Sequence, residues 1–393
     1  MLNFTYKAET KILFGTGTQS QAGEETAALC NGKRVLLHYG SGSIKKSGLY
    51  DEVVASLRES GVLFTELGGV VPNPRLSLVR EGIRLCREQD IGFILAVGGG
   101  SVIDSAKAIA AGALYEGDVW DFFGGRKSML SAIGIGVVLT IPAAGSESSD
   151  SCVITNDELN LKRGSGGSAI VPRFAILNPE LTYTLPAYQT ACGAADIFAH
   201  LMERYFTGTE HVEYSDRLLE ASMKTVMEFA PLAIAHPQDY EIRAQMMWVG
   251  KLAHDGLFDR GRIGDWGSHG IEHELSAEFD IAHGAGLAMV FPAWMRLVYT
   301  RNLPRFTQFA VRVMGVDSSL PDGDRVILEG IARLESFFRS LGLPTRLSDA
   351  PEITSTEDVL LHKLAEKAVY RGSAGAWGQL NADEVFQVYK LAM

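Results

Sequence analysis

The sequence contains few cysteines, and none of them has a redox or metal-binding spacing. The four are scattered along the 393 residues without a C-x-x-C motif: Cys30, Cys86, Cys152 and Cys192. This pattern excludes a disulfide framework and a thiolate zinc site of the zinc-finger type. We expect all four cysteines to be small buried apolar side chains in a reducing compartment.

Long apolar segments are also lacking. The longest apolar run, around residues 132–145, is too short and too rich in glycine to cross a bilayer. The first residues, MLNFTYKAETKILFG, do not have the basic-then-apolar order of a signal peptide. We therefore expect a cytoplasmic protein with no membrane partner.

An excess of basic residues is absent as well. Lysine and arginine number 36 against 47 acidic residues, which gives a net charge of −11. Because no basic patch offsets this charge, nucleic acid is excluded as a general partner. The composition is otherwise that of a globular protein, and 393 residues are enough for two or three domains.

The first half of the chain alternates short apolar runs with amphipathic stretches. We predict strands at residues 34–40, 64–67, 93–100, 135–142 and 174–179, and helices at 46–60, 75–89 and 101–114. Such alternation indicates βαβ units around a parallel sheet. From about residue 185 the apolar residues recur at helical spacing and strand patterns are absent. We expect an α/β domain at 1–183 and an all-helical domain at 184–393.

A phosphate-binding loop is indicated where the predicted strand 93–100 ends. Gly98, Gly99 and Gly100 let the backbone approach a ligand closely, and Ser101 is placed to cap the helix that follows. Neither G-x-G-x-x-G nor a Walker motif is present. In the next two turns, Asp104 and Lys107 are candidate contacts to ribose, amide or phosphate groups. The alternative is that the glycines only form a tight turn.

A second candidate cofactor contact follows the predicted strand 34–40. Enzymes that select NAD over NADP commonly have an acidic residue near such a strand end. Here the sequence has small residues and then a lysine, namely Gly40, Ser41, Gly42, Ser43 and Lys45. These would accept the 2′-phosphate of NADP, although a solvated surface turn would have the same composition. Thr140, at the end of a further strand, is another candidate nucleotide contact.

Four residues in the second half indicate one divalent-metal site. Asp196 and His200 have an i, i+4 spacing that puts both side chains on one face of a predicted helix. His269 and His283 lie in GSHGIEHELSAEFDIAHGAG, the only histidine-dense stretch. Three imidazoles and one carboxylate suit Zn²⁺ or Fe²⁺ better than Mg²⁺ or Ca²⁺. A buried histidine that bonds a backbone carbonyl is the alternative for any one of them.

Taken together, these stretches resemble the iron-containing (group III) alcohol dehydrogenase family, in its butanol-dehydrogenase-like branch. The matching stretches are GGGSVIDSAKAIA, TIPAAGSE, NPELTYTLP, the Asp196 and His200 pair, and the histidine-dense stretch. The phrase YGSGSIKKSGLYDEV is similar to the NADPH-preferring members. One departure is that Ser149 or Asp150 stands where relatives often carry an asparagine that contacts the nicotinamide side.

The resemblance implies a Rossmann-like domain, a helical domain and a cleft between them for cofactor and metal, as in dehydroquinate synthase. It places the metal ligands at Asp196, His200, His269 and His283. It makes His273 a histidine close to the metal and a candidate proton relay. The implied reaction is hydride transfer between NADP(H) and a small alcohol or aldehyde, with Fe²⁺ or Zn²⁺ as the metal. A homodimer is also implied.

Two other readings remain open at this point. His269, Glu272 and His273 match H-x-x-E-H, the inverted zincin signature, in which both histidines bind the metal and the glutamate lies near the water. That short pattern leaves the glycine loop and the Asp196–His200 pair unexplained. A metal-dependent lyase or polyol dehydrogenase of the same fold is the second reading. The lyase would need a dense basic cluster, which Arg260 and Arg262 alone do not make.

Overall fold

The computed structural model describes residues 1–125, 127–319 and 322–393, and it divides into two compact units. The sheet unit comprises Lys7–Leu185 and Pro237–Asp255. The helical unit comprises Met1–Tyr6, Pro186–His236 and Gly256–Met393. Among the described residues, no helix is long and apolar enough to span a membrane.

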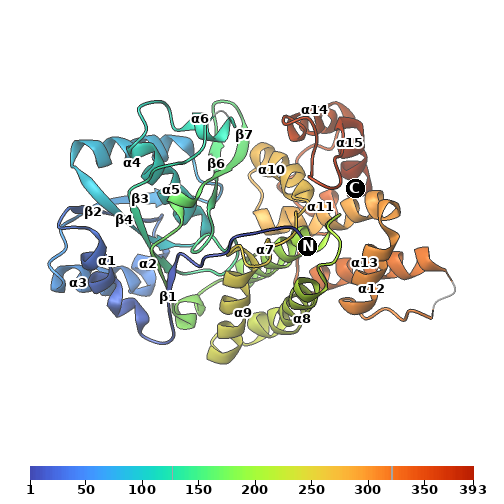
Figure 1. Cartoon of the computed structure of the whole chain (residues 1–393), viewed down its shortest axis with the longest axis horizontal. Helices are drawn as coiled ribbons and strands as arrows, with labels where there is room; N and C mark the ends of the chain where they lie inside the picture. The colour runs from blue at the N-terminus through green and yellow to red at the C-terminus, as the bar shows by residue number, and fades with distance from the viewer. Residues whose placement is uncertain (126, 320–321) are drawn as a thin grey trace. The chain divides into compact units, whose positions relative to one another are not determined.

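A six-stranded parallel sheet forms the centre of the sheet unit (Figure 1). Its strand order is β1-β8-β5-β4-β2-β3. The strands are β1 (Lys11–Phe14), β2 (Arg34–Gly40), β3 (Phe64–Val70), β4 (Ile91–Gly98), β5 (Gly134–Leu139) and β8 (Phe174–Leu177). From β2 the chain passes outward to β3 and then crosses back over β2 to β4, so the winding direction changes between β2 and β4.

Both faces of this sheet are buried, which explains why its strands are continuous apolar runs. Alternate residues of β4 enter different cores: Phe93 and Leu95 face one, and Ile94 faces the other. The first core is closed by α1 (Ala22–Leu29), α2 (Ser43–Ser47) and α3 (Leu49–Glu59). The second is closed by α4 (Leu76–Glu88), α5 (Gly100–Ala113) and α6 (Trp120–Phe123).

Besides β1, α1 and α6, two further features of the sheet unit were not predicted from the sequence. The first is an antiparallel hairpin of β6 (Ser151–Asn156) and β7 (Leu161–Gly166) that contacts α5. The second is α9 (Tyr240–Ala253), a helix from the second half of the chain that belongs to this unit. Its Trp248 ring meets Phe14 edge-on at 5.8 Å. Helical periodicity identifies a helix, but it does not say against which domain the apolar face packs.

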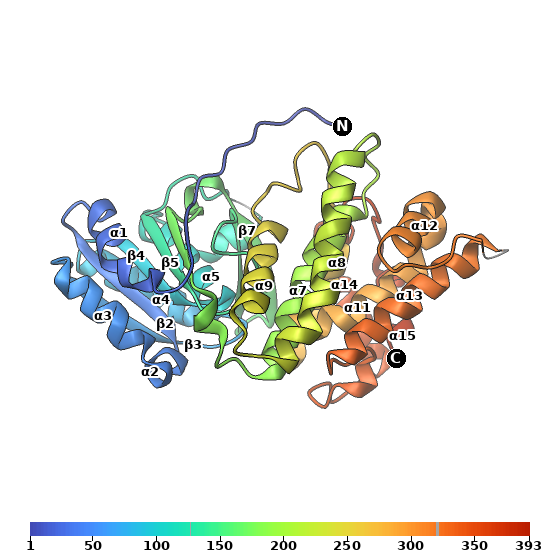
Figure 2. The ribbon, with the colours of Figure 1, turned by 90° about the horizontal axis from the view of Figure 1, so that it is seen from below.

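The helical unit is built around α11 (His283–Val298), whose residues 284–295 are all buried. A helix that is apolar on every side must be surrounded, and α11 contacts α7 (Ala187–Tyr205), α10 (Gly267–Phe279), α13 (Gly323–Ser340) and α15 (Ala382–Leu391). Figure 2 shows α7 beside the long α8 (Glu213–Ala235). The unit is completed by α12 (Leu303–Arg312) and α14 (Asp358–Ala368).

The predicted fold class is confirmed: a parallel-sheet unit is followed by a helical unit, and the predicted strands are found within a few residues of their expected bounds. The expected helix at 46–60 is in fact two helices, because Gly48 adopts a left-handed φ of 86° between α2 and α3. The division into an α/β domain at 1–183 and a helical domain at 184–393 stays a prediction.

Candidate metal centre and cofactor loops

Helix α7 carries the first two candidate metal donors. Asp196 and His200 lie one turn apart and are both about 5% exposed, and Nδ1 of His200 is 3.3 Å from Oδ1 of Asp196. Helix α11 passes α7 very closely. A Cβ atom at Gly284 would lie only 2.0 Å from the carbonyl oxygen of Cys192. Only glycine permits this approach, and it brings the first turn of α11 to the donors on α7.

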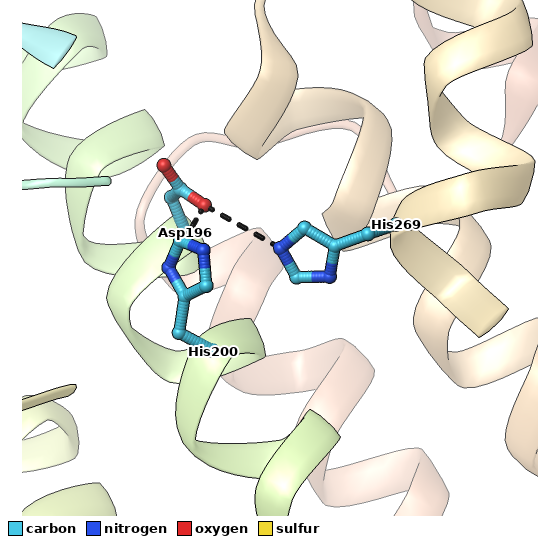
Figure 3. A group of neighbouring side chains, drawn as sticks. All are labelled: Asp196, His200 and His269. Carbon is cyan, nitrogen blue, oxygen red and sulfur yellow. Dashed lines mark ion pairs between the residues drawn. The ribbon is translucent and has the colours of Figure 1, made fainter. Parts of the chain in front are cut away.

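The two remaining predicted donors come from the first turns of α10 and α11. Nε2 of His269 and Nε2 of His283 each lie 3.9 Å from Oδ1 of Asp196. Figure 3 shows Asp196, His200 and His269 pointing toward one another from two helices, and the donor atoms of these three residues lie within 4.8 Å of each other. The structure therefore brings together all four residues that the sequence indicated.

The arrangement fits a divalent metal. Within the described part of the chain, Oδ1 of Asp196 and Nε2 of His269 are buried and make no hydrogen bond. Leaving such an atom unsatisfied costs about 1–3 kcal/mol, so a ligand is expected there. Bonds of about 2.0–2.1 Å in a tetrahedral zinc site separate neighbouring donors by about 3.4 Å. The distances of 3.3 and 3.9 Å from Oδ1 of Asp196 are close to that separation.

The electrostatics of His269 are those of a cation-binding group. Burial lowers the pKa of its imidazole, but the nearby carboxylates of Asp196 and Glu203, together with the hydrogen bond from Nδ1 to Glu203, outweigh burial and raise the pKa to about 9. Negative charge concentrated around Nε2 thus attracts a proton when no metal ion is bound. Because a metal ion needs the same lone pair, proton and metal compete for this atom.

His273 lies beside the cluster and outside its centre. Its ring is 5.4 Å from that of His283 and is partly exposed. Among the described residues, a ring nitrogen of His273 lies within 4.8 Å of donor atoms of Glu272 and His283. His269 belongs to a different group of donors, together with Asp196 and His200. An inverted zincin would have His269 and His273 on one ion, so the geometry disfavours that reading.

The candidate cofactor loops meet at one edge of the sheet. The turn after β2 and the turn after β4 leave neighbouring parallel strands at their carboxyl ends, where the winding direction changes. Ligands of open α/β sheets bind outside the carboxyl ends of the strands at such a switch point. Thr140 follows the next strand, β5, and its backbone N–H donates to the carbonyl of Gly98 at 3.1 Å.

The glycines at the end of β4 are required by packing of the chain itself. A Cβ at Gly99 would lie 2.1 Å from Cγ2 of Ile141, and one at Gly98 would lie 2.5 Å from Cγ2 of Val102. The prediction that Ser101 caps the helix is wrong: α5 begins at Gly100 and its N-cap is Gly99, without a side-chain hydrogen bond. The reason is that the helical conformation starts one residue earlier than the serine pattern suggests.

The turn after β2 presents small residues and a lysine. Helix α2 begins at Ser43 behind Gly42, whose φ is 153°. Nζ of Lys45 lies 4.7 Å from the ring centre of Tyr50 and 5.0 Å from that of Tyr39, and the lysine is exposed. These rings hold the ammonium group beside the end of β2 by cation–π contact.

Two polar residues of α5 hold the segment after β5. The carboxylate of Asp104 accepts from Oγ of Ser146 at 2.5 Å and from the backbone N–H of Val153 at 2.9 Å, and burial raises its pKa. Lys107 is fully buried and donates to the carbonyl oxygens of Ser149 and Ser151 at 2.8 and 2.9 Å. The expectation of a phosphate contact for Lys107 is therefore wrong, because its ammonium group is used inside the fold.

Comparison with known proteins identifies the family. The model described as iron-containing alcohol dehydrogenase matches residues 9–179, and that of the C-terminal part of the Fe-containing alcohol dehydrogenase family matches residues 190–393. The chain belongs to the iron-containing alcohol dehydrogenase family. A probable NADH-dependent butanol dehydrogenase of Bacillus subtilis is 43% identical over 100% of both chains.

Other members of the family cover the chain almost as fully. An NADPH-dependent aldehyde reductase of Escherichia coli is 38% identical over 93% of this chain and 94% of its own. The crystal structure of an NADH-dependent butanol dehydrogenase A from Thermotoga maritima superposes with a TM-score of 0.95 at 40% identity, covering 100% of this chain and 99% of the other.

Membership of the iron-containing alcohol dehydrogenase family establishes the reaction class. The chain is an oxidoreductase that acts on alcohols and aldehydes and uses a divalent metal and a nicotinamide cofactor. This decides against both the metallopeptidase and the lyase that the sequence left open.

Sequence reasoning missed two residues that contact the candidate ligands. Glu203 bonds His269, and Glu272 bonds His283. Helical spacing was the available signal for Glu203, which follows Asp196 and His200 at i+7 and i+3 on the same face of α7. Glu272 was noticed only as part of H-x-x-E-H, and that motif suggested a different role for it.

Proposed function

We propose that this member of the family reduces small aldehydes with NADPH and oxidises the corresponding alcohols. In this proposal Asp196, His200, His269 and His283 bind one Fe²⁺ or Zn²⁺ ion. Nitrogens of all three histidines lie within 3.9 Å of Oδ1 of Asp196, and that buried oxygen makes no hydrogen bond among the described residues. This convergence carries the proposal.

The residues around the metal have separable tasks. A bound divalent ion would act as a Lewis acid on the carbonyl or hydroxyl oxygen of the substrate. Asp196 would be the only anionic ligand, so a divalent ion would keep part of its positive charge, which favours an electron-rich oxygen ligand. The donor set accepts Fe²⁺ and Zn²⁺ alike, so metal supply decides which one occupies it.

His273 is the proposed proton relay. It is the partly exposed histidine next to His283, so it can exchange a proton with solvent while the buried imidazoles cannot. Its role is to deliver or remove the proton that accompanies hydride transfer. We expect its loss to slow turnover without abolishing metal binding.

The cofactor is held at the carboxyl edge of the sheet in this proposal. Gly98, Gly99, Gly100 and Ser101 would take the pyrophosphate at the start of α5. Asp104 and Thr140 are the further candidate nucleotide contacts, and Asp104 also holds the segment after β5 through Ser146 and Val153. The adenosine end would meet Gly40, Ser41, Gly42, Ser43 and Lys45.

A preference for NADPH over NADH rests on the turn after β2. No carboxylate lies between Gly40 and Lys45, and the ammonium group of Lys45 is held at that strand end. A 2′-phosphate would gain a charge-assisted hydrogen bond there. The relatives differ in this respect, because the Bacillus subtilis protein is named NADH-dependent and the Escherichia coli protein NADPH-dependent.

Turnover of butyraldehyde tests the proposal. Chelator-stripped protein is compared with protein reloaded with Zn²⁺ or Fe²⁺, and NADPH and NADH are assayed in parallel. We expect turnover only after reloading and a higher kcat/KM with NADPH. Tight NADPH binding without turnover on any metal would contradict the substrate class, and faster turnover with NADH would contradict the cofactor preference.

We also propose that the enzyme is a cytoplasmic homodimer with a dinucleotide-binding domain at 1–183 and a metal-binding domain at 184–393. The homodimer comes from the family resemblance, and the location is supported by the cysteines, three of which are buried and all of which are free. Light scattering coupled to size-exclusion chromatography tests the mass of the assembly, and cell fractionation tests the location. A monomeric mass or recovery outside the cytosol would contradict these statements.

A further inference from the structure

Glu203 ties the ligand-bearing part of α7 to the start of α10. Its side chain is fully buried, and Oε1 accepts from Nδ1 of His269 at 2.8 Å and from the His269 backbone N–H at 3.0 Å. Oε2 accepts from the backbone N–H of Trp266 at 2.6 Å. One carboxylate thus fixes both the backbone and the imidazole of a candidate metal ligand.

Glu272 makes the corresponding connection from α10 to α11. Its Oε2 is hydrogen-bonded to Nδ1 of His283, and Oγ of Ser276 donates to its Oε1. Helix α11 leaves space for this carboxylate, because a Cβ at Gly286 would lie 2.4 Å from Oε1 and 2.7 Å from Cγ of Glu272. The glycine is therefore matched to the position of the glutamate.

The two carboxylates have the same relationship to their histidines. Each accepts the proton of Nδ1, which leaves the lone pair on Nε2, and both Nε2 atoms lie 3.9 Å from Oδ1 of Asp196. A hydrogen bond to one ring nitrogen of histidine decides which tautomer is present and orients the other nitrogen toward a metal. Three helices are thereby linked in sequence, α7 to α10 and α10 to α11.

We propose that Glu203 and Glu272 are positioning residues, which hold His269 and His283 in the tautomer and orientation that bind metal through Nε2. The proposal rests on the ligand set of the proposed function. It also gives the glutamate of the H-x-x-E-H pattern a role outside peptidase chemistry, because both of its oxygens are engaged by Ser276 and His283.

The test is a measurement of metal affinity in the variant Glu272→Gln. This substitution preserves the shape of the side chain and one acceptor oxygen but removes its charge. Chelator-stripped protein is titrated with Zn²⁺ against a chromophoric chelator. Loss of a carboxylate that supports a ligating histidine typically weakens metal binding 10–100-fold, and we expect a weakening in that range for Glu272→Gln. Glu203→Gln should act in the same direction, provided that the protein still folds.

Glu274→Gln is the matched control. Glu274 is a buried carboxylate two residues further along α10, and its side chain therefore leaves the helix on a different face. We expect wild-type zinc affinity for this variant. A loss of zinc affinity equal to that of Glu272→Gln would mean that any buried charge on α10 affects zinc binding. This result would overturn the positioning role.

Gly286→Ala gives a second variant in which the carboxylate remains but is displaced. Its methyl group would occupy the space of Oε1, so metal affinity should fall although Glu272 is intact. Co²⁺-loaded protein adds a spectroscopic readout: the visible bands should shift in Glu272→Gln and Gly286→Ala and should be unchanged in Glu274→Gln. Unshifted bands in both variants would contradict the proposal.

Two further results would overturn the proposal. Wild-type zinc affinity in Glu272→Gln would show that the contact is only structural. Complete loss of zinc, as deep as in His283→Ala, would make Glu272 a ligand itself. Failure of the proposed function has a different signature, because His269→Ala and His283→Ala would then retain wild-type affinity whatever the glutamate variants do.

Discussion

Nε2 of His283 lies 3.9 Å from Oδ1 of Asp196, although the two residues belong to helices α11 and α7. The close approach of these helices at Gly284 and Cys192 makes this distance possible. The proposed metal centre thus depends on helix packing as much as on the ligands themselves. Substitutions at its ligands should remove the metal while leaving the sheet unit, with its cofactor loops, unaffected.

His283→Ala should abolish metal retention and turnover. The variant loses one of three imidazole ligands. Loss of a group that only supports a ligating histidine already weakens metal binding about 10–100-fold, so loss of the ligand itself should weaken it more. Metal content of the purified protein and NADPH affinity by fluorescence are the two measurements. We expect less than about a tenth of wild-type zinc and unchanged NADPH affinity, whereas His236→Ala, at an exposed histidine, should retain both.

Lys45→Ala should weaken NADPH binding selectively. A hydrogen bond between charged groups contributes roughly 1.5–3 kcal/mol, which corresponds to about 10–100-fold in KM for NADPH. KM for NADH should change little, because NADH has no 2′-phosphate. Lys46→Ala is the control, since Lys46 is an exposed lysine on the same short helix. Equal losses with both cofactors would show that Lys45 does not read the 2′-phosphate.

Gly99→Ala separates the two explanations for the glycine loop. Its Cβ would collide with Cγ2 of Ile141, so the single variant should lose about 1–3 kcal/mol of stability. In the double variant Gly99→Ala/Ile141→Ala the collision is relieved and stability should recover. We expect NADPH affinity to stay low in the double variant, because the added methyl group still keeps the pyrophosphate from the backbone. Recovery of affinity would mean that the glycine only serves packing.

His38 should make the folded protein sensitive to mild acid. Burial lowers its pKa from 6.5 to about 4, and its nitrogens are held by the carbonyl of Leu67 and Oγ of Ser105. Between these two pKa values the unfolded chain binds the proton and the folded chain does not. Stability therefore falls as the pH drops below 6.5, by about 2 kcal/mol at pH 5.

Urea unfolding of wild type and His38→Asn at pH 8 and pH 5 measures this contribution. The asparagine can still donate to Leu67 but does not titrate. The loss of unfolding free energy between the two pH values should be about 2 kcal/mol smaller in the variant. An identical loss in both proteins would show that His38 is not the responsible group.

Much of the cluster proposed to bind metal could be predicted from the sequence because helical spacing is a local property. The i, i+4 spacing of Asp196 and His200 places them on one face before anything is known of the fold. His269 and His283 could be added from the density of histidines, but the bond of each to a glutamate could not. Those bonds depend on the packing of α7, α10 and α11, which no spacing within one helix reveals.

In the cofactor region the sequence located the loops but did not predict the role of every residue in them. The glycine loop and the lysine turn could be located because strand ends are visible in the sequence. The role of Lys107 could not be predicted, since its partners come from the segment after β5 that ends in an unpredicted hairpin. In the same way, the periodicity of α9 identified the helix but not its place in the sheet unit.

X-ray absorption at the zinc edge of the reloaded enzyme tests the central claim most directly. We predict one zinc per chain with nitrogen and oxygen neighbours only and with the multiple-scattering pattern of three imidazoles. A sulfur neighbour at about 2.3 Å would place Cys192 among the ligands. A second equivalent of zinc, or a pattern of fewer imidazoles, would contradict the site formed by Asp196, His200, His269 and His283.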